Sequence, residues 1–181
     1  MESGRAVESG RAVEHTLDFW RAGLTEVPDP VWRRTDLRVL ILAGNALTSL
    51  PPEVGRLRRL TTLDLGHNRL TTLPDSLGHL CHLRELRLRG NAITHLPPSA
   101  AELRELRHLD LRENALTEVP RPLARLPLLR RIDLRGNRLG GLPDWLARLP
   151  SLERLDLRWN GIDPSLPLVA ELERRGCFVL V

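Results

Sequence analysis

Asparagine recurs at a fixed interval along this chain of 181 residues, and this interval limits the possible folds more than any other feature. Consecutive asparagines are 23 residues apart and none occurs elsewhere: Asn45, Asn68, Asn91, Asn114, Asn137 and Asn160. Self-similarity at a fixed period is typical of repeat architectures, in which each unit packs against its neighbours. The chain is therefore predicted to be a solenoid rather than a globule with a single central core.

Each asparagine ends the same nine-residue motif, Leu-x-x-Leu-x-Leu-x-x-Asn, with one leucine replaced by isoleucine at Ile132. The alternation of leucine with other residues predicts a short strand that has one buried face. Asparagine carries both a donor and an acceptor on a short stem, so it can bond the backbone of its own and the neighbouring unit. The six asparagines are therefore predicted to form a structural ladder.

In the second half of each unit an apolar residue five places after the asparagine is followed by proline, as in Leu73-Pro74; the last unit departs from this spacing and reads Ile162-Asp163-Pro164-Ser165. Proline lacks an N–H and fixes φ, so it suits the first position of a short helical turn. Asp75 and Asp144 directly follow such prolines, and an acidic residue there favours the turn. Short helices or 3₁₀ turns are therefore expected opposite the strands.

These motifs resemble the leucine-rich-repeat family, in its 23-residue subtype with Leu-Thr-x-Leu-Pro in each unit. The resemblance implies an α/β fold: a curved right-handed superhelix with short parallel strands on its concave face and 3₁₀ or short helical turns on its convex face. Within the family the chain is similar to intracellular Ras-suppressor and erbin-like scaffolds, plant intracellular Ras-group proteins and bacterial repeat proteins.

The predicted domain spans residues 15–181: a degenerate cap unit at 15–36, six repeats at 37–174 and a terminal strand at 175–181. Leu17 and Phe19 fall in phase with the repeat leucines, and Phe178 and Leu180 fall in phase as the last strand, after a helix at 168–175. Residues 1–14 contain a tandem hexapeptide and are expected to be a disordered tail.

The non-leucine positions of the strands are expected to face the concave side, where arginine and aspartate gather in the C-terminal half. The candidate partner-binding residues are Arg87, Arg89, Asp110, Arg112, Arg131, Asp133, Arg135, Arg154, Asp156, Arg158 and Trp159. Arginine binds carboxylates and phosphates bidentately, and tryptophan and arginine are frequent in interface hot spots. The alternative interpretation is that aspartate and arginine neutralise each other as a solvated face.

The function hypothesis is a non-enzymatic protein–protein interaction module, an intracellular scaffold or adaptor that binds a partner protein through its concave face. The resemblance implies signalling proteins or small GTPases as partners. The alternative is binding of nucleic acid or another polyanion through the arginine columns, since the pI is about 10.6. Acidic residues between the arginines and an aromatic content of only 3% favour the protein partner.

Catalytic, metal and cofactor sites are not expected, because no phosphate loop, nucleotide fingerprint or hydrolase elbow occurs. His79, Cys81 and His82 are close in sequence, but a metal site would need a fourth ligand. Cys81 as a nucleophile would need an acid or amide that orients His82. These residues are most simply interpreted as convex-surface side chains.

The location is expected to be cytoplasmic. Cys81 and Cys177 are far apart in sequence and fit a reducing compartment. The N-terminus lacks the apolar region of a secretory signal, and no run of about 18 apolar residues suggests a membrane span. We expect a monomer without membrane association.

Overall fold

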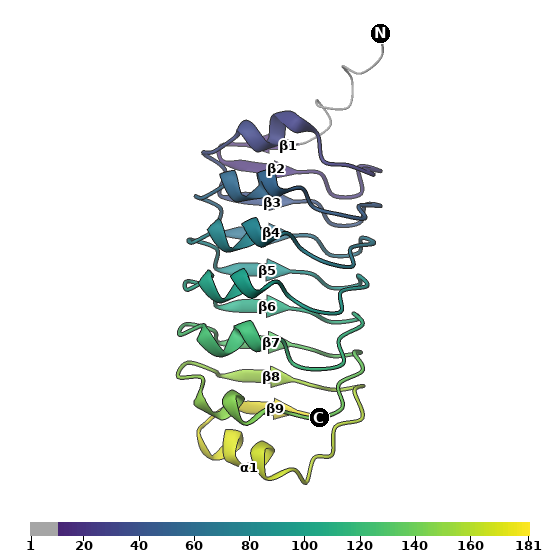
Figure 1. The fold of residues 1–181 in the computed structure, drawn as a ribbon. Coiled ribbons are helices and arrows are strands. Elements are labelled where there is room, and N and C mark those ends of the chain that lie inside the picture. Colours follow the sequence, from purple (N-terminus) through teal and green to yellow (C-terminus); the bar gives the residue numbers. More distant parts are fainter. Residues whose placement is uncertain (1–10) are drawn as a thin grey trace.

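The computed structural model describes residues 11–181, whose strands form one nine-stranded sheet in chain order (Figure 1). The strands are β1 (Arg11–Val13), β2 (Thr16–Asp18), β3 (Val39–Ile41), β4 (Thr62–Asp64), β5 (Glu85–Arg87), β6 (His108–Asp110), β7 (Arg131–Asp133), β8 (Arg154–Asp156) and β9 (Phe178–Leu180). Strands β2 to β9 pair in parallel, whereas β1 pairs antiparallel with β2. The short parallel strands of the prediction are confirmed.

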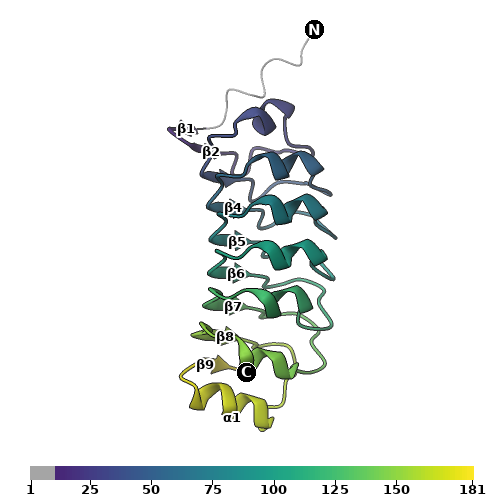
Figure 2. The same ribbon diagram turned by 60° about the vertical axis from the view of Figure 1, so that its left-hand side comes forward.

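One short helix follows most strands and lies on the opposite side of the stack (Figure 2). The 3₁₀ helices are η1 (Asp29–Arg33), η2 (Pro52–Arg56), η3 (Asp75–His79), η4 (Pro98–Glu102), η5 (Arg121–Arg125) and η6 (Asp144–Arg148), and α1 (Pro167–Arg174) is the α-helix of the last unit. Each 3₁₀ helix begins directly after a proline, as at Pro74 and Pro143. The predicted 3₁₀ turns are therefore confirmed. The units stack in an almost straight column, so the expected curvature is slight over this length (Figure 1).

The asparagine ladder joins each unit to the one before it. The Asn114 amide nitrogen donates to the carbonyl oxygens of Leu111 in its own unit, at 3.1 Å, and of Leu88 in the preceding unit, at 3.0 Å. Its Oδ1 accepts a hydrogen bond from the Ile93 amide at 3.0 Å. The other ladder members make the same three kinds of bond: Asn45, Asn68, Asn91, Asn137 and Asn160. Backbone groups that would otherwise be buried without partners are satisfied in this way.

The leucines of the motif fill the space between the sheet and the helices. Leu60, Leu63 and Leu65 of one unit are fully buried, and so are Leu83, Leu86 and Leu88 of the next. In each unit a residue near the middle of the 3₁₀ helix, such as Val54 or Leu77, closes the interior from the other side. Stability therefore comes from stacking each unit on its neighbours, because one unit alone cannot cover its own apolar face.

The N-terminal boundary differs from the expectation. Leu17 and Phe19 are buried and Leu17 pairs with Leu40, so the degenerate cap strand is where the repeat phase predicts it. However, β1 lies inside the segment 1–14 that was expected to be a disordered tail. A strand there covers the edge of β2, which would otherwise expose unpaired backbone groups. The rest of the predicted tail, residues 1–10, lies outside the described residues.

The phase predicted for the last strand is wrong by one residue. Leu155 pairs with Val179 and Arg154 with Phe178, so this unit is one residue longer than the 23-residue period. Val179 is buried, whereas 57% of the Phe178 surface is exposed. The additional residue lies between Asn160 and the Leu166-Pro167 pair, because this pair follows its asparagine by six residues where Leu142-Pro143 follows Asn137 by five. From the Leu-Pro pair to the next strand the spacing is unchanged, although the eight-residue α1 replaces a five-residue 3₁₀ helix there and ends before Gly176, which has a φ of +85°.

Replacing Asn114 with alanine is expected to lower the free energy of unfolding by about 1–3 kcal/mol, because three buried backbone groups lose their partner. Urea unfolding followed by circular dichroism measures the change. Thr117→Ala, at an exposed position in the same unit, is the control and should leave the midpoint within error. Equal midpoints for both variants would contradict the ladder role of Asn114.

The shifted register of β9 predicts opposite outcomes for two adjacent residues. Val179→Ala should cost about 1–2 kcal/mol, since buried methyl groups are lost, whereas Phe178→Ala should change stability by less than about 0.5 kcal/mol. Thermal unfolding of both variants measures this. A larger loss of stability for Phe178→Ala than for Val179→Ala would contradict the shifted register and support the phase of the 23-residue repeat.

Candidate functional site

The side of the sheet opposite the helices, here called the sheet face, carries the outward side chains of strands β2 to β9 in columns. Strand register places Glu85, His108, Arg131, Arg154 and Phe178 side by side in the first column. The second column contains Asp64, Arg87, Asp110, Asp133 and Asp156. Arg89, Arg112, Arg135 and Arg158 come two residues after the members of the second column. The structure thus brings the predicted partner-binding residues together on one face.

Alternating charges form a continuous Asp–Arg network across the last three repeats. Its members are Asp110, Arg112, Asp133, Arg135, Asp156 and Arg158. Each arginine binds the aspartate two residues before it through two nitrogens; for Arg112 and Asp110 the distances are 2.9 Å from Nε to Oδ1 and 2.7 Å from Nη2 to Oδ2. Arg112 and Arg135 also approach the aspartate of the next strand, at 3.4 and 3.5 Å.

Asp156 lies at the most buried point of this network, with only 3% of its side chain exposed. Burial by itself raises the pKa of this carboxyl. The hydrogen bond from Arg158 and the charge of Arg135 lower the pKa, and together they outweigh the effect of burial. The net result is a pKa below the ordinary aspartate value, so the carboxylate stays ionised. Arg112, Arg135 and Arg158 are therefore paired within the protein, as the alternative interpretation of the sequence had it.

The arginines nearer the N-terminus are also paired. Arg87 donates from Nε to Glu85 at 2.8 Å and lies 3.3 Å from Asp64, while Arg89 lies 3.2 Å from Glu113. By contrast, among the described residues Arg131 forms no hydrogen bond or ion pair through its side chain, and the only carboxylate near Arg154 is Asp156 at 3.7 Å. The predicted arginines thus divide into paired members and two that are largely unpaired.

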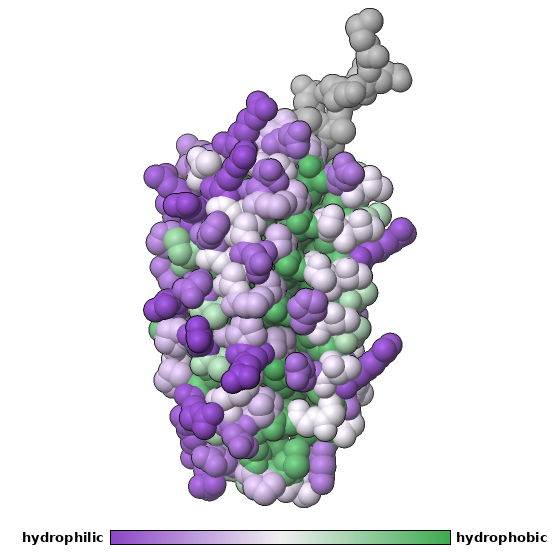
Figure 3. Space-filling view, viewed as in Figure 1, coloured by the Kyte–Doolittle hydropathy of each residue, from purple (hydrophilic) through white to green (hydrophobic). Residues whose placement is uncertain are grey.

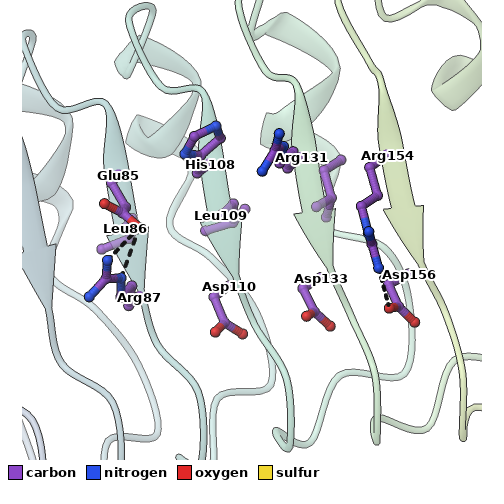
Figure 4. Close-up of a pocket in the computed structure, with 11 residues that line it drawn as sticks. Glu85, Leu86, Arg87, His108, Leu109, Asp110, Arg131, Asp133, Arg154 and Asp156 are labelled. Atoms are coloured by element: carbon purple, nitrogen blue, oxygen red, sulfur yellow. Dashed lines mark hydrogen bonds and ion pairs between the residues drawn. The ribbon is translucent and has the colours of Figure 1, made fainter. Parts of the chain in front are cut away.

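A shallow hollow of about 290 Å³ lies over β5 to β8 (Figure 4). First-column side chains, including His108, Arg131 and Arg154, form one side of it, and the second-column aspartates form the other (Figure 4). His108 and Arg131 are both exposed. The hollow therefore presents basic groups along one edge and arginine-neutralised carboxylates along the other.

Two exposed aromatic rings stand at the C-terminal end of the sheet face. Trp159 is 72% exposed, and the guanidinium carbons of Arg135 and Arg158 lie 5.9 and 5.7 Å from its ring centroid. Trp159 has a φ of +63°, close to that of the equivalent Gly136, and this backbone region costs a bulky residue about 1–2 kcal/mol. Phe178 lies 5.4 Å from the guanidinium carbon of Arg154. The prediction from sequence missed Phe178 because the 23-residue phase placed it in the core.

The cluster around Cys81 lies elsewhere. His82 Nδ1 is 2.9 Å from Glu105 Oε1, and the other oxygen of this carboxylate, Oε2, accepts a hydrogen bond from Arg84 Nε at 3.1 Å. Cys81 is exposed, and no hydrogen bond joins it to His82. Within the described part of the chain, no three or more His, Cys, Asp or Glu side chains are arranged to hold a metal ion.

The second cysteine, Cys177, is buried beneath β9, and burial raises the pKa of its thiol to about 11. Neither cysteine forms a disulfide. Among the helices of residues 11–181, none has the length and apolar character needed to cross a bilayer.

A family model described as leucine rich repeat matches residues 35–93 and 81–139, and a second leucine rich repeat model matches residues 148–165. A leucine-rich-repeat protein of Leptospira interrogans is similar in structure, with a TM-score of 0.81 and 36% identity over 87% of this chain. The repeat ectodomain of a plant membrane receptor kinase from Arabidopsis thaliana, solved with CASPARIAN STRIP INTEGRITY FACTOR 2, has a TM-score of 0.75 and 32% identity over 91%. This chain spans 40% of the bacterial and 20% of the plant chain. A search of curated proteins found no match.

Asp156→Asn is expected to lower the free energy of unfolding by about 1–3 kcal/mol at pH 7, because the charged acceptor of Arg158 is lost. The folded pKa is depressed, so this stabilisation is present above the ordinary value of about 4 and disappears as the pH falls through the folded pKa. Urea unfolding from pH 7 to pH 3 should therefore show the two proteins converging. Glu118→Gln, at an exposed position, is the control. A difference in unfolding free energy between Asp156→Asn and the original protein that stays constant from pH 7 to pH 3 would contradict the role of Asp156 in the network.

Proposed function

The chain belongs to the leucine-rich-repeat family, and from this we propose that it is a non-enzymatic interaction module that binds a partner protein through the sheet face. The observation that carries the proposal is the C-terminal half of this face, where the Asp–Arg network, the hollow and two exposed aromatic rings adjoin. Arginines already held by aspartates lose little side-chain freedom on binding, so complex formation costs less entropy. Exposed tryptophan beside arginine is typical of interface hot spots.

The location of Trp159 supports the proposal independently. A bulky residue in the left-handed region, with most of its surface in water, contributes little to folding. Glycine holds the equivalent position in three of the other repeats, as at Gly136 with a φ of +62°, and smaller polar or charged side chains hold it in two, at His67 and Glu113, with a φ of +52° and +54°. A contact with a partner therefore explains this exposed ring better than a role in the core does.

The comparison with a solved complex supports a protein or peptide as the partner. The plant receptor ectodomain was solved in complex with CASPARIAN STRIP INTEGRITY FACTOR 2, and this chain is 32% identical to it. Because this chain spans only a fifth of that chain, the partner of the present protein is part of the proposal. We propose a cytoplasmic scaffold or adaptor that acts as a monomer and binds a signalling protein, for example a small GTPase.

The distribution of charge favours a protein partner over nucleic acid. A polyanion needs a continuous track of unpaired basic groups, since each phosphate must find a cation. On the sheet face, Asp110, Asp133 and Asp156 lie between the arginines and bind them. A phosphate backbone laid across the C-terminal half of this face would meet these carboxylates on β6, β7 and β8.

Photo-crosslinking from defined positions tests which face binds. A benzoylphenylalanine residue replaces His108 on the sheet face, or Arg125 on η5 as the matched control on the helix side. After nuclease treatment of source lysate, the protein with the probe at residue 108 should capture a discrete partner that the probe at residue 125 does not. Capture from residue 125 alone would contradict the proposal, and material that nuclease removes would point to the polyanion alternative.

A further inference from the structure

Two arginines of the first column lie directly opposite each other without a full counter-charge. Arg131 and Arg154 are register partners on β7 and β8. Neighbouring strands lie about 4.8 Å apart, and like charges directly opposite each other destabilise a sheet. Among the described residues, no carboxylate approaches Arg131 to ion-pair distance, and Arg154 has only the 3.7 Å approach of Asp156.

The carboxylates nearby are already engaged. Asp156 receives two hydrogen bonds from Arg158, at 2.9 and 2.8 Å, and is almost fully buried. Asp133 is bound in the same way by Arg135. The Asp–Arg network is therefore close to neutral, and the hollow retains the positive charge of Arg131 and Arg154 at its edge.

We propose that Arg131 and Arg154 together anchor a single carboxylate or phosphoryl group on an extended segment of the partner protein. The inference rests on the proposed function, because it specifies which part of the sheet face receives the partner and by what chemistry. In this structure the Arg131 guanidinium is turned toward His108 and that of Arg154 toward Asp156 (Figure 4), so both exposed side chains turn toward each other when they hold the oxygens of one such group. Arginine binds both kinds of anion bidentately.

The surroundings of the pair restrict the ligand further. Arg154 lies over the exposed Phe178 ring, which restricts the guanidinium and offers an apolar contact beside the anion. Asp133 and Asp156 line the other side of the hollow and are already bound by Arg135 and Arg158, so this side offers no free cation to a second anionic group. The site therefore suits an isolated acidic or phosphorylated residue next to an apolar one, rather than a run of charges.

Nuclear magnetic resonance of the arginine side-chain Nε–H groups tests the anchor directly. Inorganic phosphate and acetate are the probes, and Arg121 and Arg125 on η5, at exposed positions outside the sheet face, are the internal controls. The signals of Arg131 and Arg154 should saturate at a phosphate or acetate concentration about tenfold lower than those of the controls. A response to phosphate alone would indicate a phosphoryl ligand. A response to both phosphate and acetate would indicate that the site also accepts a carboxylate. Equal responses of all four arginines would overturn the inference.

Stability separates binding from a structural role. Arg131→Gln removes one of two like charges, so its unfolding midpoint at low salt should equal or exceed that of the original protein. A lower midpoint would mean that Arg131 stabilises the sheet. This would contradict the inference that Arg131 is left unpaired in order to bind a ligand.

The cross-link from residue 108 distinguishes this inference from the proposed function. Arg131→Gln with Arg154→Gln should reduce capture at least about tenfold, whereas Arg121→Gln with Arg125→Gln should leave it unchanged. Capture that persists with both anchors removed would leave the sheet face as the binding face and overturn the anchor. Absence of any cross-link from residue 108 in the original protein would instead contradict the proposed function.

Discussion

The hydrogen bonds of the asparagine ladder are the interaction on which the rest of this structure depends. Each side-chain amide occupies a turn where backbone donors and acceptors are buried, and it serves groups of two successive units at once. Because each amide bonds two units, it opposes any sliding of one unit along the next. Register follows, and with it the identity of the side chains that share a column.

Because the register is fixed, equivalent residues of successive repeats lie side by side on the surface. Aspartate recurs at the same strand position in β6, β7 and β8, and arginine recurs two residues later. In a parallel sheet without slippage, each of Arg112 and Arg135 reaches two aspartates, so isolated pairs become one network. The network neutralises most of the charge on this face, although the chain as a whole is basic. The remaining unpaired charge is concentrated on the first column.

The sequence predicted these features to very different degrees. The leucines and asparagines repeat without interruption, and their positions follow from covering one face and satisfying one turn. Phe178 was misplaced because a single additional residue in the last unit reverses which side of the strand faces inward. The sign of that shift was the Leu166-Pro167 pair, which follows its asparagine one residue later than Leu142-Pro143 does. Gly176 then ends the α-helix that replaces the 3₁₀ turn.

From the sequence alone came the family resemblance, the repeat period, the ladder, the position of the helical turns and the membership of each column as far as β8. These are properties of local spacing, because every unit repeats the same short-range solution. Only the tertiary structure decided which arginines have partners: Arg112 and Arg131 are both arginines on neighbouring repeats, yet one is held by two aspartates and the other by none among the described residues. The pair within one strand follows the Asp-x-Arg spacing, but the second contact, 3.4 Å from Arg112 to Asp133, depends on side-chain reach between strands, which spacing along the chain does not encode.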